Sequence, residues 1–343
     1  MKRSIDWRPV LCGLALATVA AMPSAGETAG GTVRVAGGTP SGDYITFARA
    51  TCDALGSLFV CNAVETKGSL DNVERLRLPL TDPAAVDIAF VQGNVADQLQ
   101  QAPGFNDDFV VVRNIAGEAV FLVMTPETAA AVRNWAGIKN TAFLLSMGLP
   151  GEKSGDTAAF NALRAMADSP LQALEVKQYQ GRPELLAAVR SGAVRIGWLV
   201  QYPNPDNALF QAIDTAGLVV MGVVDPDFVQ LGGAFGVQDV TVANAKLFGI
   251  GGAAKRLHTT TVKAAIAARA QNTFPDLRSQ KIQDAAIRKI QEAPEADILP
   301  KKSWITDLIN KKTFMAKVAV GQLYDQMTGE AVGAKERVGQ LDK

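Results

Sequence analysis

The chain has 343 residues, of which 48% are hydrophobic, and its 34 Lys and Arg residues are balanced by 34 Asp and Glu residues. This apolar content with moderate charge excludes an intrinsically disordered chain. The absence of a basic surplus excludes a nucleic-acid partner, because such proteins bind by displacing counterions. A length above about 300 residues exceeds the size at which one hydrophobic core usually keeps growing, so we expect two lobes.

The first residues have the pattern of a secretory signal peptide. Lys2, Arg3 and Arg8 give a basic start, a mostly apolar run covers 10–22, and small residues follow. The run is shorter than the about 20 apolar residues that a membrane span needs. We predict that residues 1–26 are a cleaved signal peptide and that the mature protein is periplasmic and not inserted in a membrane. A retained N-terminal anchor is the alternative.

The first part of the mature chain alternates short apolar strands with helices. Each predicted strand is followed by a polar loop that contains glycine and then by a helix. This order is typical of a parallel α/β sheet with helices on both faces. Strands are predicted over 32–36, 58–65 and 87–92, and helices over 44–55, 70–78 and from 94 onward.

The same order starts again in the second part, which predicts a second α/β lobe. Strands are predicted over 109–112, 118–124, 141–147, 174–179, 194–200 and 218–224, and helices over 125–135, 157–167, 183–191 and from 208 onward. A long strand-like run, rich in Thr, Val and Ile, follows at 257–267. Helices are then predicted over 276–292, 303–312 and 314–327.

Four loops lie at the carboxyl ends of predicted strands, where open α/β sheets bind their ligands. In these loops glycines, hydroxyl groups or side-chain amides precede a helix, whose N-terminus presents N–H groups and a positive partial charge. We expect these loops to converge on a carboxylate or a phosphate, although the same residue types are also ordinary helix caps. The candidate ligand-binding residues in these loops are Thr39, Ser41, Gly42, Thr66, Gly68, Ser69, Gln92, Lys153, Ser154, Gly155 and Thr157.

Charged and aromatic residues near these loops leave alternatives open. Asp43 would repel an anion unless it caps a helix or meets an ammonium group, as in an amino acid. Lys153 is either the cationic partner of the ligand or a solvated lysine. Tyr44, Trp198 and Tyr202 either line the cleft or pack in the core, and the first two are kept as candidate ligand contacts.

Two cysteines, Cys52 and Cys61, remain after removal of the signal peptide. Export permits a disulfide between them. Closing a loop of about ten residues would stabilise the fold by about 2–3 kcal/mol. The alternative is a pair of buried thiols, while a metal site lacks further ligands nearby. We predict the disulfide.

The sequence gives little support to an enzyme. His258 is the only histidine and lies in a strand-like run, so neither Ser-His-Asp nor Cys-His catalysis is indicated. Residues 148–154 resemble a phosphate loop, but Glu152 replaces the glycine that precedes the lysine in that motif. No zinc ligand set and no acidic pair stands out. We predict a binding protein with no enzyme activity, metal or cofactor.

The order of the loops resembles the TAXI family of substrate-binding proteins, which serve TRAP transporters. The similarity extends from about 33 to 270 and departs from the family pattern at 43–45, 155–157 and 197–198. The family motifs are matched by Gly38, Thr39, Gly42 and Tyr44, by Thr66, Gly68, Ser69 and Asn72, by the Asp-Ile-Ala-Phe-Val-Gln strand at 87–92, and by the Pro-Gly loop at 150–156.

This resemblance implies a two-lobed type II periplasmic binding protein fold. Lobe I would comprise 27–115 and 255–343, lobe II would comprise 116–254, and crossover strands near 116–124 and 257–267 would join them. It also implies a glutamate-like amino acid or a dicarboxylate, anionic or zwitterionic, bound between the lobes and passed to TRAP membrane subunits. We expect a monomer. A binding protein for an ABC importer, or a periplasmic sensor that reports to a signalling partner, has the same fold and is the alternative.

Overall fold

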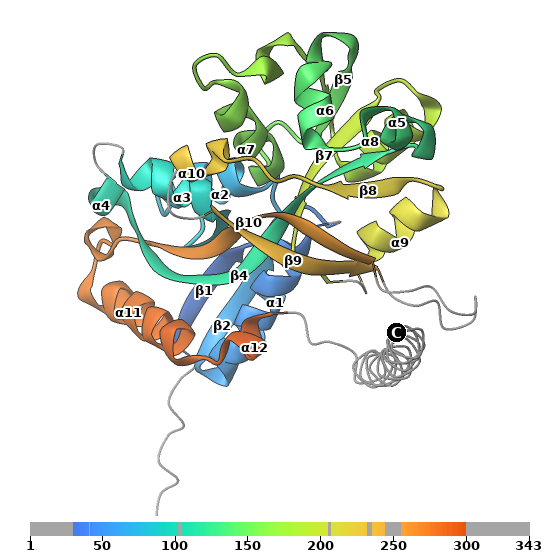
Figure 1. The fold of residues 1–343 in the computed structure, drawn as a ribbon. Helices are drawn as coiled ribbons and strands as arrows, with labels where there is room; N and C mark the ends of the chain where they lie inside the picture. The colour runs from blue at the N-terminus through green and yellow to red at the C-terminus, as the bar shows by residue number, and fades with distance from the viewer. Residues whose placement is uncertain are drawn as a thin grey trace, which may run out of the picture.

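The computed structural model describes residues 30–40, 42–101, 105–204, 207–231, 235–243 and 255–299. They form one ten-stranded sheet with helices on both of its faces (Figure 1). The strands are β1 (Gly30–Ala36), β2 (Phe59–Val64), β3 (Ile88–Gln92), β4 (Phe109–Met124), β5 (Ser146–Pro150), β6 (Glu175–Tyr179), β7 (Ile196–Gln201), β8 (Val219–Gly222), β9 (Phe235–Ala243) and β10 (Lys255–Arg269).

The helices alternate with the strands along the chain. They are α1 (Asp43–Leu55), α2 (Ser69–Arg77), α3 (Gly93–Gln100), α4 (Phe105–Asp108), α5 (Pro126–Val132), α6 (Trp135–Asn140), α7 (Gly155–Arg164), α8 (Arg182–Ser191), α9 (Ala208–Thr215), α10 (Asp227–Gln230), α11 (Leu277–Glu292) and α12 (Glu295–Ile298). The predicted helices at 303–312 and 314–327, and the predicted signal peptide, lie outside the described residues.

The strand order repeats at the two ends of the sheet. At one end, the parallel strands β2, β1 and β3 are followed by antiparallel β10 and then by the first part of β4. At the other end, the parallel strands β6, β5 and β7 are followed by the last part of β4, antiparallel to β7, and then by β8. This repeated order confirms the expected two-lobed α/β fold. We call the half with β1–β3 lobe I and the half with β5–β8 lobe II.

Strands β4 and β10 run through both lobes and pair with each other in antiparallel register from Thr261–Ala119 to Arg269–Phe109. The apolar pattern predicts two strands here, at 109–112 and 118–124, whereas β4 is a single strand of 16 residues. The polar residues between the predicted strands still find ladder partners on β10, so the strand continues across them. The predicted crossover near 116–124 is therefore the second half of a longer strand.

Two other predicted elements differ from the structure. The helix predicted at 125–135 divides into α5 and α6, because Arg133 has a φ of 63° and the Asn134 side chain caps the new helix at the Gly137 N–H. The strand predicted at 141–147 is replaced by a 3-10 turn followed by β5. Strand β9, which pairs with β10, was not predicted.

Each lobe buries both faces of its part of the sheet. In lobe I, Ile88 and Phe90 pack toward α1 and α11, while Ala89 and Val91 pack toward α2 and α3. In lobe II, alternate residues of β4 face α6 and α7 on one side and α8 and α9 on the other. This two-sided burial explains why the strands are continuous apolar runs in the sequence. Each large apolar side chain that is buried stabilises the fold by about 1.5–3 kcal/mol.

Cys52 of α1 and Cys61 of β2 form the predicted disulfide, with their Cα atoms 5.3 Å apart. It ties the first helix to the edge strand of lobe I, away from the centre of the sheet. Among the described residues, no helix combines the length and the apolar character that crossing a bilayer requires.

Candidate functional site

A cleft lies where the two lobes meet beside β4, and both lobes line it. It encloses about 60 Å³. Lobe I contributes the loops before α1 and α2 and the end of β3, and lobe II contributes the loops before α7 and α8 and the end of β7. All of these segments follow the carboxyl end of a strand, as the rule for open α/β sheets predicts.

The lobes touch along the edge of this cleft. The Leu70 N–H donates to the Lys153 carbonyl oxygen at 3.1 Å. At Gly68, φ is 116° and an added Cβ would lie 2.9 Å from the Ser154 Cα, so only glycine permits this approach. Lys153 Nζ lies 2.5 Å from Glu74 Oε2 at the exposed rim. The structure therefore holds the lobes together across the cleft.

Helices from both lobes start at the cleft and direct their positive ends toward it. Gly42, Gly68 and Gln92 precede α1, α2 and α3, and none of the three caps its helix with a side chain. In lobe II, Ser154 does cap α7, because its Oγ accepts the Thr157 N–H at 3.1 Å. Gly181, which precedes α8 in lobe II, provides no side-chain cap either, so uncapped helix N-termini from both lobes border the cleft.

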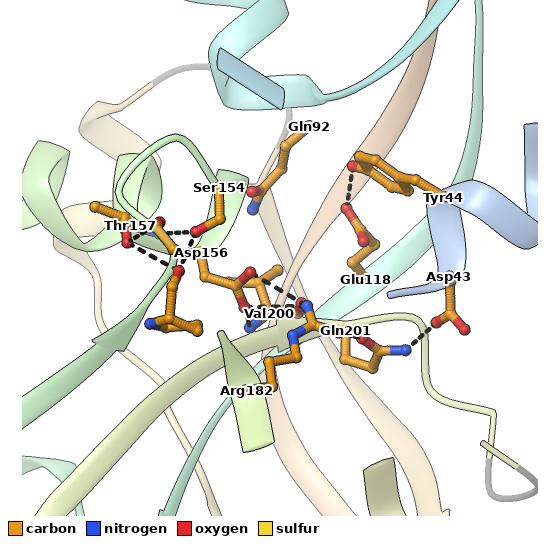
Figure 2. Close-up of polar contacts among 12 residues, drawn as sticks. Asp43, Tyr44, Gln92, Glu118, Ser154, Asp156, Thr157, Arg182, Val200 and Gln201 are labelled. Carbon is orange, nitrogen blue, oxygen red and sulfur yellow. Dashed lines mark hydrogen bonds and ion pairs between the residues drawn. The ribbon is translucent and has the colours of Figure 1, made fainter. Parts of the chain in front are cut away.

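Lobe II supplies a buried ion pair to the cleft (Figure 2). Arg182 Nη2 lies 3.2 Å from both carboxylate oxygens of Asp156 and donates to the Val200 carbonyl oxygen at 2.7 Å. The other terminal nitrogen of Arg182 donates to the Gln201 side-chain oxygen. Asp156 also accepts the Val200 N–H at 2.6 Å. Both charges are therefore satisfied within lobe II.

Asp43, at the first position of α1, accepts hydrogen bonds from two amide side chains of lobe II. Gln201 Nε2 donates to one carboxylate oxygen, and Asn207 Nδ2 donates to the other at 2.5 Å. Burial raises the pKa of Asp43 to about 6, although Arg182 and the Asn207 bond oppose this rise. Asp43 thus links the two lobes through hydrogen bonds from uncharged side-chain amides.

Glu118 of β4 is 5% exposed and lines the cleft. The Tyr44 hydroxyl donates to Glu118 Oε2 at 2.6 Å. Burial raises the pKa of Glu118 to about 8, and Asp156 and Asp43 add to the rise, while the Tyr44 bond and Arg182 oppose it. At pH 7 about nine in ten Glu118 side chains are then neutral.

Gln92 ends β3 and lines the cleft, with its side-chain amide beside Ser154 and directed toward Asp156 (Figure 2). Its backbone N–H donates to Ser69 Oγ at 3.0 Å. Its side-chain Nε2 is buried and has no hydrogen-bond partner. An unpaired buried donor costs about 1–3 kcal/mol, so this group is suited to receive an acceptor from a ligand.

The structure brings together many of the residues predicted from the sequence. Predicted residues that line the cleft are Thr39, Gly42, Tyr44, Gly68, Ser69, Gln92, Ser154 and Gly155. Ser41 lies outside the described residues. Lys153 faces Glu74 at the rim instead of lining the cleft.

Three other predicted residues brace the walls and do not line the cleft. Thr66 Oγ1 donates to the Gly37 carbonyl oxygen at 3.1 Å, and Thr157 Oγ1 donates to the Gly151 carbonyl oxygen at 2.9 Å. Trp198 is fully buried, and its Nε1 donates to the Asp156 carbonyl oxygen at 3.0 Å. These bonds fix the loops before α2 and α7.

Four residues that line the cleft are not among the candidates predicted from the sequence: Glu118, Asp156, Arg182 and Gln201. Arg182 and Gln201 follow or end predicted strands, so the strand-end rule that selected the four loops would also have selected them. Glu118 has a different signal, a lone acidic residue at the start of an apolar strand. Within the described ranges, no group of three or more His, Cys, Asp or Glu side chains is arranged to hold a metal ion.

No protein-family model matches this chain, and no curated protein matches it in sequence. Solved structures do show similarity. A structure described as a periplasmic transporter is 13% identical, with 85% of this chain and 97% of that chain covered and a TM-score of 0.45. The arginine-bound amino acid ABC transporter substrate-binding protein AbpA from Streptococcus pneumoniae is 14% identical, with 78% and 92% covered and a TM-score of 0.43.

The OxyR2 regulatory domain from Vibrio vulnificus is 14% identical, with 77% of this chain and 95% of that chain covered and a TM-score of 0.42. The function of this chain is therefore inferred from its own cleft.

Proposed function

We propose that this protein is a periplasmic solute receptor that captures a small carboxylate-bearing ligand between its lobes and does no chemistry on it. The observation that carries this proposal is the convergence of helix N-termini from both lobes on one cleft, together with the unpaired Gln92 Nε2 inside it. Helix N-termini and an amide donor suit a carboxylate. Lobe I would comprise 27–115 and 255–343, and lobe II 116–254.

The ligand class that we propose is a glutamate-like amino acid or a dicarboxylate, and the recipient is a TRAP-type transporter. Both follow from the resemblance of the loops to the TAXI family. The two crossing strands support a mechanism in which ligand bound between the lobes stabilises their contact.

A thermal-shift screen tests this proposal. The mature protein is mixed with the L-amino acids and with dicarboxylates of four and five carbons. A ligand at a hundredfold excess over its dissociation constant adds about 2.7 kcal/mol of stability. We expect Ser69→Leu and Gln92→Leu to abolish the response, and Gln98→Leu, an exposed position on α3, to keep it. The proposal fails if no compound raises the melting temperature, or if both cleft variants respond like the parent protein.

A further inference from the structure

The cleft contains more buried acid than its one buried cation can neutralise. Asp43, Glu118 and Asp156 are 5%, 5% and 6% exposed. Arg182 is the only buried cationic side chain among the described residues that line the cleft, and its hydrogen bonds go to Asp156, Gln201 and Val200. Lys67 also borders the cleft but is exposed. Two carboxyl groups thus face the ligand space without a cation in contact.

Glu118 is the more isolated of the two. The titratable and charged groups around it are Tyr44 and Asp43 from α1, Asp156 from α7 and Arg182 from α8. Within the described part of the chain, the Tyr44 hydroxyl donates a hydrogen bond to it, which favours the ionised carboxylate but is outweighed by burial. An ionised carboxylate buried without a cation is costly, so Glu118 keeps its proton in the protein as described.

Gln92 gives a second and independent indication of a ligand. Its side chain is 2% exposed, its Nε2 has no partner, and it lines the same cleft as Glu118, with its amide directed toward Asp156 (Figure 2). One wall therefore presents an unsatisfied donor, and the centre of the cleft presents acids without a cation. A ligand that satisfies both the unpaired donor and the acids carries a hydrogen-bond acceptor at one end and a positive charge at the other.

Building on the proposed function, we propose that Asp43 and Glu118 form a subsite for a cationic amino group of the ligand, and that Glu118 releases its proton when this group binds. The Glu118 carboxyl group loses H⁺ to the solvent, and the ligand enters as an ammonium ion. The products are a carboxylate paired with the ammonium ion and one solvated proton. No bond in the ligand changes. Among the proposed ligands, this subsite selects amino acids over dicarboxylates.

The pH dependence follows from this exchange. Below pH 8, Glu118 must give up a proton for each ammonium ion bound, so affinity rises by about tenfold from pH 6 to 7 and by about fivefold from pH 7 to 8. Above pH 8, Glu118 is already ionised, and affinity levels off. A dicarboxylate gives the opposite trend, because ionisation of Glu118 and Asp43 repels it.

Calorimetric titration with matched probes tests the subsite. L-glutamate is compared with glutarate, and L-alanine with propionate, each pair differing only in the amino group. Titrations at pH 7 in two buffers of different ionisation enthalpy give the number of protons released. We expect the amine-bearing partner to bind more than tenfold tighter and to release about 0.9 proton.

Glu118→Gln should abolish the proton release and the pH dependence, and Glu175→Gln, at an exposed position on β6, should keep both. Asp43→Asn serves as a second variant if Glu118→Gln does not fold, and it should reduce the preference for the amine. The subsite proposal fails if glutarate binds as tightly as L-glutamate, or if Glu118→Gln releases as many protons as the parent protein. Either result leaves the proposed receptor function unaffected. If none of these four probes binds although the thermal-shift screen finds a ligand, the subsite fails; if the screen also finds none, the receptor proposal fails with it.

Discussion

The two walls of the cleft carry carboxyl groups of similar burial but of different bonding. On the lobe II wall, Asp156 is paired with Arg182 and accepts the Val200 N–H, so its charge is balanced inside one lobe. On the lobe I wall, Asp43 accepts hydrogen bonds from neutral amides across the cleft, and Glu118, on β4 at the centre of the cleft, accepts one from the Tyr44 hydroxyl. Burial alone therefore does not identify an acid that binds a ligand. The hydrogen-bond and ion-pair partners of the carboxyl group identify it.

The largest effect is expected on the lobe II wall. Arg182→Met leaves Asp156 buried without its cation, and we expect the free energy of unfolding to fall by about 3–5 kcal/mol. Urea denaturation measures this change. The double variant Arg182→Met, Asp156→Leu should lose less, because it removes both charges. A loss in the single variant below about 1 kcal/mol would show that the pair does not stabilise this wall.

The second-largest effect is expected on the pH dependence of stability, and it arises from Glu118. The pKa of Glu118 is raised by burial from 4.5 to about 8, so between these pH values the folded protein binds more protons than the unfolded chain. Stability from this group is present below pH 4.5 and is lost as pH rises to 8, by on the order of 4 kcal/mol. In Glu118→Gln we expect a smaller fall in unfolding free energy between pH 5 and pH 8. Equal slopes in both proteins would contradict the assignment.

The disulfide lies outside both walls of the cleft, so its removal should change stability but not ligand binding. Replacing Cys52 and Cys61 together by serine should lower the free energy of unfolding by about 2–3 kcal/mol, because the unfolded chain is no longer constrained. The bond joins α1 to β2 and neither cysteine lines the cleft. Ligand-induced shifts in melting temperature should therefore keep their size. A lost ligand response would mean that the disulfide also positions the start of α1.

The smallest effect is expected at the rim. Lys153 pairs with Glu74 in solvent, where such pairs contribute little. Lys153→Met should leave stability and the ligand response unchanged, as measured by thermal shift with and without L-glutamate. If this variant loses the ligand response while Ser69→Leu keeps it, the sequence-based assignment of Lys153 to the ligand is right. Lys153 would then contact the ligand although it pairs with Glu74 at the rim.

Local sequence signals determined much of the fold. Strand-loop-helix order, glycine-rich strand ends and two apolar lobes were readable because periodicity and turn chemistry act over a few residues. Positions such as Gly68, Ser69 and Gln92 were found by the same local rule. The continuity of β4 was not readable, because its polar middle residues become part of a strand only when β10 supplies their ladder partners.

The sequence by itself determined which loops could meet a ligand, since a residue's place at the end of a strand is a local property. Only the tertiary structure decided which charges those loops would balance. Arg182 neutralises Asp156 and not Glu118, and Lys153 reaches Glu74 and not the cleft. These pairings join residues from separate elements, 26 and 79 positions apart along the chain. The physical reason is that the charge state of a buried acid depends on neighbours and burial that only chain folding brings together.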